Sequence, residues 1–147
     1  MKKINVYLHT FCSELMELMP QLMRGFIRYE HDSLQRGTIT PVQFWALDYL
    51  YNKGALPMSD FAHYLGITKP SATALINRLI TQKLVVRQHD ANDRRIVRIA
   101  LTAQGKKLTA SIKQQRYHAL RSIFGKIEQR DRSEYLRIIK EVVRVLG

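Results

Sequence analysis

The sequence predicts a mainly α-helical protein that carries a small β-hairpin at its centre. Two observations lead to this fold class. Residues 58–82 show the apolar spacing of two short helices separated by a glycine, and residues 84–101 hold two β-branched runs separated by a polar loop. Residues 1–36 and 104–147, in contrast, show helical spacing over longer stretches. Long helices are therefore expected on both sides of a compact centre.

The second short helix is expected to begin near Thr68, whose hydroxyl can accept a hydrogen bond from a first-turn N–H. Pro70 falls within that turn, where the missing N–H costs little. The apolar residues at helical spacing are Ala72, Leu75, Ile76 and Leu79. The opposite side carries Lys69, Pro70, Thr73, Asn77 and Arg78. Small polar and cationic groups in a compact row suit a helix that lies in a groove.

The first short helix is expected to bury Phe61, Ala62 and Leu65 and to end at Gly66 in the left-handed conformation. A turn of about three or four residues between two such helices is that of a helix-turn-helix. The hairpin strands are expected at residues 84–89 and 96–101, with the turn-prone loop 90–95 between them. A hairpin directly after a helix-turn-helix is a wing, so the centre is predicted to be a winged helix-turn-helix.

Upstream, Thr40 and Pro41 predict the start of another helix and Gly54 its end. The bulky side chains of this helix are Phe44, Trp45, Leu47, Tyr49 and Leu50. Residues 55–57 are expected to form a short strand beside the wing, and residues 35–38 a connector. These elements would complete the winged unit.

The N-terminal stretch has apolar residues in alternating steps of three and four, at Ile4, Leu8, Phe11, Leu15, Leu18 and Leu22. This a/d seam predicts a helix packed along another helix, for which a second chain is one source. Pro20 predicts a kink or a break near Met19.

Thr102 is expected to cap a long helix carrying Leu108, Ile112, Leu120, Phe124 and Ile127, with its end near Gly125. A last helix follows. Its apolar side is formed by Tyr135, Ile139, Val142, Val143 and Leu146.

The net charge of +12 is unevenly distributed. Residues 1–67 carry six basic and six acidic residues, which cancel. Residues 68–98 carry seven basic and two acidic residues, and residues 99–147 carry eleven basic and four acidic residues. The excess therefore begins at the predicted groove helix, as expected for a polyanionic partner. Charge alone does not separate nucleic acid from an acidic membrane, and a solvated basic face remains an alternative.

Composition also indicates the cellular compartment in which the protein is expected. No apolar run reaches the roughly 18 residues that a membrane span needs, and the N-terminal residues lack the continuous apolar segment of an export signal. The single cysteine allows no internal disulfide, which fits a reducing compartment. A cytoplasmic protein without a membrane partner is expected.

Five sequence blocks occur in a characteristic order: TPVQFWALDYL (40–50), LGITKPSATALINRL (65–79), KLVVRQ (83–88), DANDRR (90–95) and IALTAQGKKL (99–108). With these blocks the chain resembles the MarR family of winged-helix transcription regulators. The resemblance implies a single domain over residues 1–147, with a DNA-binding core at 40–102 and dimerisation helices at 1–36 and 104–147. The sequence departs from the family at Pro57, which stands where a capping serine or threonine is common. The start of the following helix is therefore expected only to within one or two residues.

The function implied is that of a sequence-specific regulator that binds double-stranded DNA as a homodimer. A repressor of a near-palindromic operator, released by a small ligand, is the expected form. The alternatives are a non-enzymatic helical adaptor that binds acidic protein partners and a thiol-based redox-sensing regulator that uses Cys12.

In such a protein, phosphate contacts supply affinity and base contacts supply sequence choice. Ser71, Thr73 and Asn77 are candidates for hydrogen bonds to bases, and Pro70 and Ala74 for contacts with thymine methyl groups. Lys69 and Arg78 are candidates for bases or phosphates, and Thr68 completes the predicted set. For each residue the alternative is an exposed helix position without a contact.

In the wing, Asp93 and Arg95 have the D-x-R spacing with which the family braces the tip and places an arginine near the minor groove. Arg94 is the neighbouring candidate, and the sequence does not order the two arginines. A plain surface ion pair is the alternative.

The family often binds small aromatic or lipophilic molecules between its dimer layer and its winged helix. The candidate pocket residues here are His9, Phe11, Met16, Met23, Phe44 and Trp45. Ordinary core or interface packing is the alternative for each. In peroxide-sensing members of the family, the first helix carries the reactive thiol, and Cys12 lies in the corresponding helix here. The sequence between Cys12 and residues 40–41 is, however, about one helical turn longer than in those members. A buried, inert thiol is therefore favoured.

Catalysis and metal binding have little support in the sequence. It has no phosphate-cradling glycine-rich loop and no G-x-S-x-G motif. The five histidines form no H-x3-H pair and have no cysteine or carboxylate cluster at ligand spacing. We therefore expect a protein that is not an enzyme and that has no metal site and no cofactor.

Overall fold

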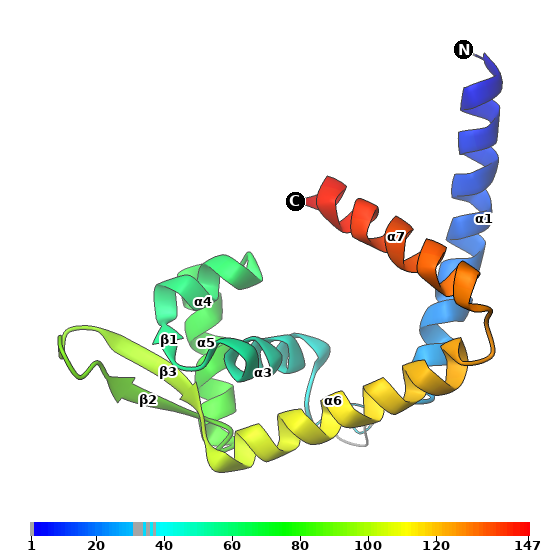
Figure 1. Ribbon diagram of the computed structural model, residues 1–147. Coiled ribbons are helices and arrows are strands. Elements are labelled where there is room, and N and C mark those ends of the chain that lie inside the picture. The colour runs from blue at the N-terminus through cyan, green and yellow to red at the C-terminus, as the bar shows by residue number, and fades with distance from the viewer. Residues whose placement is uncertain (1, 31–33, 35, 37) are drawn as a thin grey trace. The chain divides into compact units, whose positions relative to one another are not determined.

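The computed structural model describes residues 2–30, 34, 36 and 38–147, with side chains from residue 6 onward. The elements in chain order are α1 (Lys2–Ile27), α3 (Pro41–Lys53), β1 (Leu56–Pro57), α4 (Met58–Leu65), α5 (Lys69–Thr81), β2 (Val85–His89), β3 (Val97–Leu101), α6 (Ala103–Phe124) and α7 (Gln129–Leu146) (Figure 1). The predicted fold class, mainly helical with a small wing, is confirmed. Residues up to 29 and residues 114–147 form one compact unit, and residues 30–113 form another.

The core of the unit 30–113 lies where α3, α4 and α5 meet the strands and the first turns of α6. The stripe predicted for α5 is buried there, and the large side chains around it include Phe44, Leu47, Leu50, Phe61, Leu84, Ile99 and Ile112. Burial of such a side chain contributes about 1.5–3 kcal/mol. Trp45, in contrast, is 55% exposed. Positions 44, 47 and 50 face inward, and the helical rotation of about 100° per residue turns position 45 outward.

The helix-turn-helix has the predicted ends. Gly66 ends α4 with φ of 62° and ψ of 30°, the left-handed conformation that glycine adopts without a Cβ penalty. The Thr68 hydroxyl caps α5 by accepting from the Ser71 N–H, and Pro70 lies in the first turn. Helix α4 begins directly after Pro57, which provides no side-chain cap. The two short helices are therefore fixed by their own turn residues.

Helix α3, which precedes the helix-turn-helix, has a more complete N-terminal cap than α5 has. Thr40 accepts from the Gln43 N–H, and the Gln43 side chain accepts from the Thr40 N–H at 2.8 Å. This capping box fixes the start of α3 where the sequence predicts it. Gly54 ends the helix at φ of 78°. The connector predicted at 35–38 includes Gln35 and Gly37, which lie outside the described residues.

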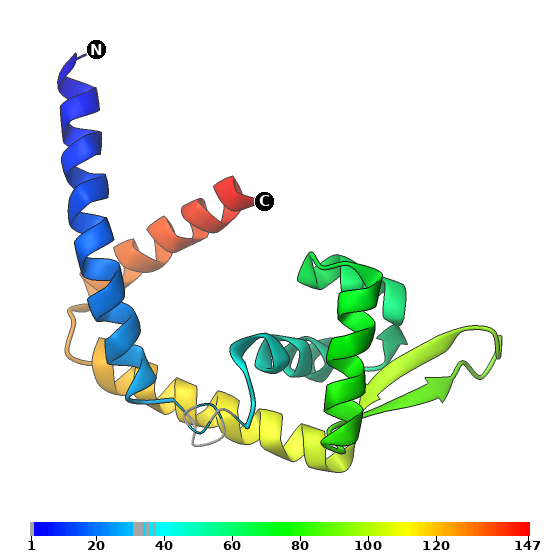
Figure 2. The same cartoon turned by 180° about the vertical axis from the view of Figure 1, so that it is seen from behind.

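The strands form an antiparallel sheet in the order β1-β3-β2. Leu56 pairs with Ile99, and β2 pairs with β3 from Val85 opposite Leu101 to His89 opposite Val97. The short strand predicted at residues 55–57 is therefore present beside the wing. Val85, Ile99 and Leu101 are buried on one face of this sheet. Helix α5 packs against β2 at the base of the wing (Figure 2).

The junction between the wing and α6 is closely packed around Gly105. The Thr102 N–H donates to the Leu84 carbonyl at 3.0 Å, and the Thr102 hydroxyl donates to the Lys83 carbonyl at 2.7 Å. The same hydroxyl accepts from the Gly105 N–H at 3.0 Å, so Thr102 caps α6 as predicted. A Cβ on Gly105 would lie 2.0 Å from the Leu84 carbonyl oxygen. Glycine is thus required by this close approach.

The other unit contains α1, the C-terminal part of α6 and α7. Helix α1 runs through Pro20, so no break occurs near Met19. Proline removes a single N–H donor, and the helix continues past it. Helix α6 ends at Phe124, as predicted, and Ile127 lies beyond it rather than on it. Helix α7 has no buried residues.

The apolar seam of α1 remains open to solvent in this chain. Leu8, Phe11, Leu15, Leu18 and Leu22 are 43–60% exposed. The side chain of Ile4, the first residue of the predicted seam, lies outside the described side chains. Cys12 is exposed on the same helix, which contradicts the buried thiol favoured by the sequence. The reason is that no described segment of the chain covers this part of α1.

Candidate nucleic-acid interface

The outer side of α5 presents the residues predicted to contact DNA. Thr68, Lys69, Pro70, Ser71, Thr73, Ala74, Asn77 and Arg78 are all exposed. The buried stripe Ala72, Leu75, Ile76 and Leu79 fixes this orientation, because it holds the other side of the helix in the core. The hydroxyl of Thr68 also donates to Ser71 Oγ at 2.9 Å. These two hydroxyls are therefore joined, whereas Thr73 presents its hydroxyl separately.

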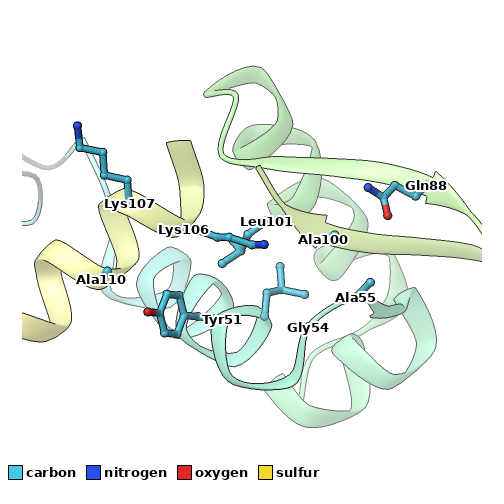
Figure 3. Close-up of a pocket in the computed structure, with 10 residues that line it drawn as sticks. Tyr51, Gly54, Ala55, Gln88, Ala100, Leu101, Lys106, Lys107 and Ala110 are labelled. Atoms are coloured by element: carbon cyan, nitrogen blue, oxygen red, sulfur yellow. The ribbon is translucent and has the colours of Figure 1, made fainter. Parts of the chain in front are cut away.

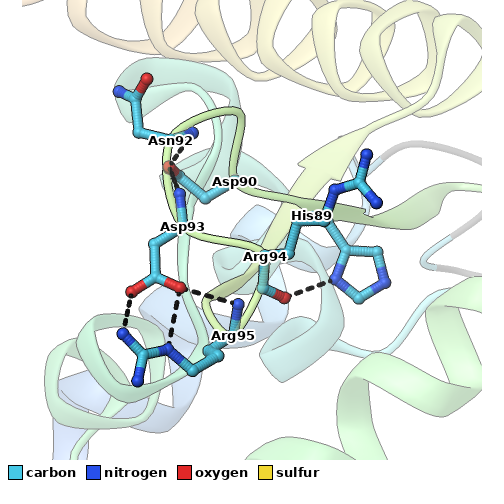
Figure 4. Close-up of polar contacts among 6 residues, drawn as sticks. All are labelled: His89, Asp90, Asn92, Asp93, Arg94 and Arg95. Carbon is cyan, nitrogen blue, oxygen red and sulfur yellow. Dashed lines mark hydrogen bonds and ion pairs between the residues drawn. The ribbon is translucent and has the colours of Figure 1, made fainter.

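At the tip of the wing, Asp93 holds Arg95 (Figure 4). Arg95 donates to Asp93 through Nε at 3.1 Å, Nη2 at 3.3 Å and its backbone N–H at 3.0 Å. The hydrogen bond from the Arg95 side chain lowers the pKa of Asp93. The Arg95 side chain is 91% exposed. The predicted D-x-R pair is therefore formed, with its guanidinium at the surface.

A second carboxylate, Asp90, organises the same loop from its base. It accepts from the backbone N–H groups of Asn92 at 2.9 Å and Asp93 at 3.1 Å, and from Arg98 Nε at 2.5 Å. The Arg98 hydrogen bond, with the two backbone N–H groups, lowers the pKa of Asp90 from 3.8 to about 2. The Asp90 side chain is only 15% exposed. Arg98 also donates to the Ala55 carbonyl at 3.5 Å, so the loop is tied to the entry of β1.

Arg94 differs from Arg95 in how it is held. Its carbonyl oxygen lies 3.0 Å from His89 Nδ1, which braces the backbone of the tip (Figure 4). Its side chain is exposed. The two arginines that the sequence does not order are therefore distinguished by their restraints: Arg95 is fixed through its guanidinium and Arg94 through its main chain.

The wing and the exposed helix are joined by a contact that the sequence analysis missed. Arg87 Nη2, on β2, donates to Asn77 Oδ1, on α5, at 2.8 Å. The sequence holds a partial signal for it, because Arg87 interrupts the apolar positions of the first wing strand. The partner depends on how α5 packs against the strand. The Asp90–Arg98 pair was missed for a similar reason.

The cavity described in the unit 30–113 has a volume of about 820 Å³. It is bounded by the end of α3, the outer face of the sheet and the start of α6. Its lining comprises Leu50, Tyr51, Gly54, Ala55, Gln88, Ala100, Leu101, Lys106, Lys107 and Ala110. The Lys106 side chain extends toward Leu101, whereas Lys107 extends away from the other labelled residues (Figure 3).

None of the six predicted pocket residues lines this cavity. His9, Phe11, Met16 and Met23 lie exposed on α1, in the other unit. Phe44 is part of the core, and Trp45 is exposed on α3. The pocket predicted between a dimer layer and the winged helix is thus a different site from this cavity and stays a prediction.

Two features of other protein classes are absent from the residues that the structure describes. They contain no group of three or more histidine, cysteine, aspartate or glutamate residues able to hold a metal ion. No helix in the same residues has the length and apolarity needed to cross a membrane.

The capped helix pair and the adjoining wing define a winged helix-turn-helix. Residues 38–96 match the model of the MarR family. The regulator FarR of Neisseria gonorrhoeae is 34% identical over 96 residues, which cover 63% of this chain and 66% of FarR. The matched part is thus just under two thirds of that relative.

Among solved structures, a MarR-like transcriptional regulator of Thermotoga maritima has a TM-score of 0.74 and 25% identity, with 92% of this chain and 95% of that chain covered. BpsR of Bordetella bronchiseptica, whose DNA binding is regulated by 6-hydroxynicotinic acid, has a TM-score of 0.63 at 23% identity. In that comparison 86% of this chain and 92% of BpsR are covered. Over residues 38–96 the chain thus matches the MarR family, and the relatives and structural neighbours named above are described as transcriptional regulators.

Proposed function

We propose that this chain is a sequence-specific, double-stranded-DNA-binding transcriptional regulator that acts as a homodimer. The observation that carries the proposal is the position of two cationic surfaces on one unit. One is the exposed side of α5, with Lys69 and Arg78, and the other is the wing tip, with Arg94 and Arg95. Because α5 packs against the wing strand β2, the two surfaces are held together in one unit.

The two surfaces have different tasks in this proposal. Helix α5 lies in the major groove, where Ser71, Thr73 and Asn77 face base edges. The wing tip follows the backbone to the minor groove, whose negative potential favours a guanidinium group. Asp93 restrains Arg95, so less side-chain freedom is lost when the arginine meets DNA.

Removal of Arg95 tests the wing. In a salt titration, log K for a fixed duplex falls linearly with log salt, with a slope set by the phosphates neutralised. We expect Arg95→Ala to lower affinity for all duplexes and to reduce this slope by about one unit. Lys53→Ala, at the C-terminal end of α3, is the matched control and should leave the slope unchanged. An unaltered slope in Arg95→Ala would remove the wing tip from the interface.

A homodimer is proposed because one helix in one groove buries too little surface for tight binding. The apolar residues of α1 and α7 that no described segment of this chain covers are suited to a second copy. In a twofold dimer, two α5 helices about 34–36 Å apart would read a near-palindromic site. A bound dimer would repress by occluding a promoter.

A small effector that releases the protein from DNA is the last part of the proposal. The cavity at α3, the sheet and α6 has mainly apolar walls and the ammonium group of Lys106. Such a lining favours an amphipathic anion. BpsR, a structural neighbour, has its DNA binding regulated by an aromatic acid, 6-hydroxynicotinic acid. Gln88 and Ala100 belong to the wing, so an effector in this cavity would contact the DNA-binding element directly.

Benzoate and its neutral analogue benzyl alcohol test the effector site. We expect benzoate to raise the melting temperature of the wild-type protein and to weaken DNA binding, and benzyl alcohol to do neither. Lys106→Met keeps the side-chain length and should abolish the response. If Lys106→Met responds as the wild type does, the effector site lies elsewhere.

Selection of bound fragments from a random duplex library tests the DNA-binding function itself. Enrichment of an inverted repeat is the expected result. Recovery of unrelated sequences at equal frequency would contradict sequence-specific binding and would favour the adaptor alternative.

A further inference from the structure

The contact between Asn77 and Arg87 sets which end of the asparagine amide faces away from Arg87 and can form a hydrogen bond to a DNA base. Arg87 Nη2 lies 2.8 Å from Asn77 Oδ1. A guanidinium group has only donors, so the atom that faces it must be the carbonyl oxygen of the amide. The amide nitrogen is therefore the part that remains turned away from Arg87. No hydrogen bond from this nitrogen is found within the described part of the chain.

Asn77 lies on the exposed side of α5, one residue before Arg78 and four after Thr73. That side is the one proposed to enter the major groove. The Asn77 backbone carbonyl accepts from the Thr81 hydroxyl at 3.0 Å, which is a bond within the helix and leaves the side chain unaffected. The orientation of the Asn77 side chain is thus set by a residue of the wing strand.

We propose that Arg87 is a positioning residue that turns Asn77 into a hydrogen-bond donor selective for guanine. This inference rests on the proposed DNA-binding function. An asparagine free at both ends of its amide pairs with adenine, accepting from N6 and donating to N7. With Oδ1 turned toward Arg87, the NH2 group is the end of the amide left for a base, and the N6 amino group of adenine would meet it donor against donor. Guanine presents two acceptors, O6 and N7, at the same place.

The test uses the duplex selected by the wild-type protein. The base pair most affected by Asn77→Ala is changed to each of the four base pairs in both half-sites, and the dissociation constants are compared. We expect the wild type to prefer guanine over adenine by about tenfold, the order of a good base contact. Arg87→Met, which keeps the stem but has no donor, should reduce this ratio below about threefold or reverse it. Arg87→Lys, whose ammonium can donate to Oδ1, should restore most of the preference.

Two further variants separate this role from a general loss of charge or of fold. Arg94→Ala removes a wing cation that does not contact Asn77, and it should weaken binding to all four duplexes while the guanine-to-adenine ratio is retained. Asn77→Asp keeps an acceptor for Arg87 but has no NH2 group, so it should abolish the guanine preference. Asn77→Asp thus tests the NH2 group directly, and Arg87→Lys tests the donor on the wing strand if Arg87→Met fails to fold: loss of the guanine preference in a folded Arg87→Lys would contradict the inference.

The outcomes are distinguishable. If Arg87→Met weakens all four duplexes equally, or if Asn77→Asp retains the guanine preference, the inference is overturned while the DNA-binding function stands. If Asn77→Ala affects no base pair, Asn77 is not a base reader and the inference is again overturned. If the wild type prefers no sequence at all, the proposed function itself fails.

Discussion

Asp90 shows how a single carboxylate orders the wing tip. Three polar groups donate to it: the backbone N–H groups of Asn92 and Asp93, and the Arg98 guanidinium, which also donates to the Ala55 carbonyl. The loop that presents Arg94 and Arg95 is therefore held at its base as well as at its tip. Order in this loop should depend on the charge of Asp90.

This dependence gives a pH prediction. The folded-state pKa of Asp90 is lowered from 3.8 to about 2. A carboxylate with a depressed pKa contributes stability that is fully present above the unfolded-state value and is lost as pH falls through the folded-state value. We therefore expect the amide resonances of Asn92 and Asp93 to titrate with a midpoint near 2 in an NMR pH series, between about pH 4 and 1.5.

Asp90→Ala is the corresponding variant. It should increase hydrogen exchange at the Asn92 and Asp93 amides at neutral pH, because both lose their acceptor. Asp60→Ala, on α4, is the control and should leave exchange in the wing unchanged. A midpoint near 3.8 in the wild type, or unaltered exchange in Asp90→Ala, would show that the carboxylate does not hold the loop.

At the scale of elements, the junction of β2, β3 and α6 depends on Gly105. Its Cβ position lies 2.0 Å from the Leu84 carbonyl oxygen, and that oxygen is already bonded to the Thr102 N–H. Gly105→Ala should destabilise the protein by about 1–3 kcal/mol in denaturant unfolding, since backbone must shift to make room. Gly25→Ala, in α1, has nothing within 4 Å and should be neutral or slightly stabilising. Equal stabilities of the two variants would contradict the packing at this junction.

Local rules predicted most of the elements. The caps of α5 and α3, the glycine ends of α4 and α3 and the stripe Ala72 to Leu79 follow from residues close in sequence. The contacts that these rules missed join distant segments: Asn77 with Arg87, and Asp90 with Arg98 and Ala55. Their partners are chosen by strand register and by helix packing, which no local pattern encodes.

The predicted pocket between a dimer layer and the winged helix stays a prediction. Its six residues belong to α1 in one unit and to α3 in the other. The cavity that the unit 30–113 does contain is lined largely by alanine, leucine and lysine, residue types with no distinctive signal in a sequence. The candidate effector site therefore required the structure.

At the scale of the whole molecule, the exposed seam of α1 predicts assembly. Leu15 is 43% exposed in this chain, with Phe11 and Leu18 beside it on the same side of the helix. Leu15→Glu would place a charge in the proposed interface, where an unpaired charge is costly. We expect it to convert a dimer to a monomer in sedimentation equilibrium. Ser13→Glu, an equal charge change on the same helix but off the seam, should remain dimeric, and dissociation of both variants alike would argue against the seam as the interface.

The spacing of half-sites tests the central claim most directly. Anisotropy titrations would compare the selected inverted repeat with duplexes in which about 5 base pairs, half a helical turn, are inserted between the half-sites. The account predicts two chains per duplex and a loss of affinity of at least about tenfold on insertion, because the second α5 helix would then face the wrong side of the DNA. Equal affinity for both duplexes, or one chain per duplex, would contradict it.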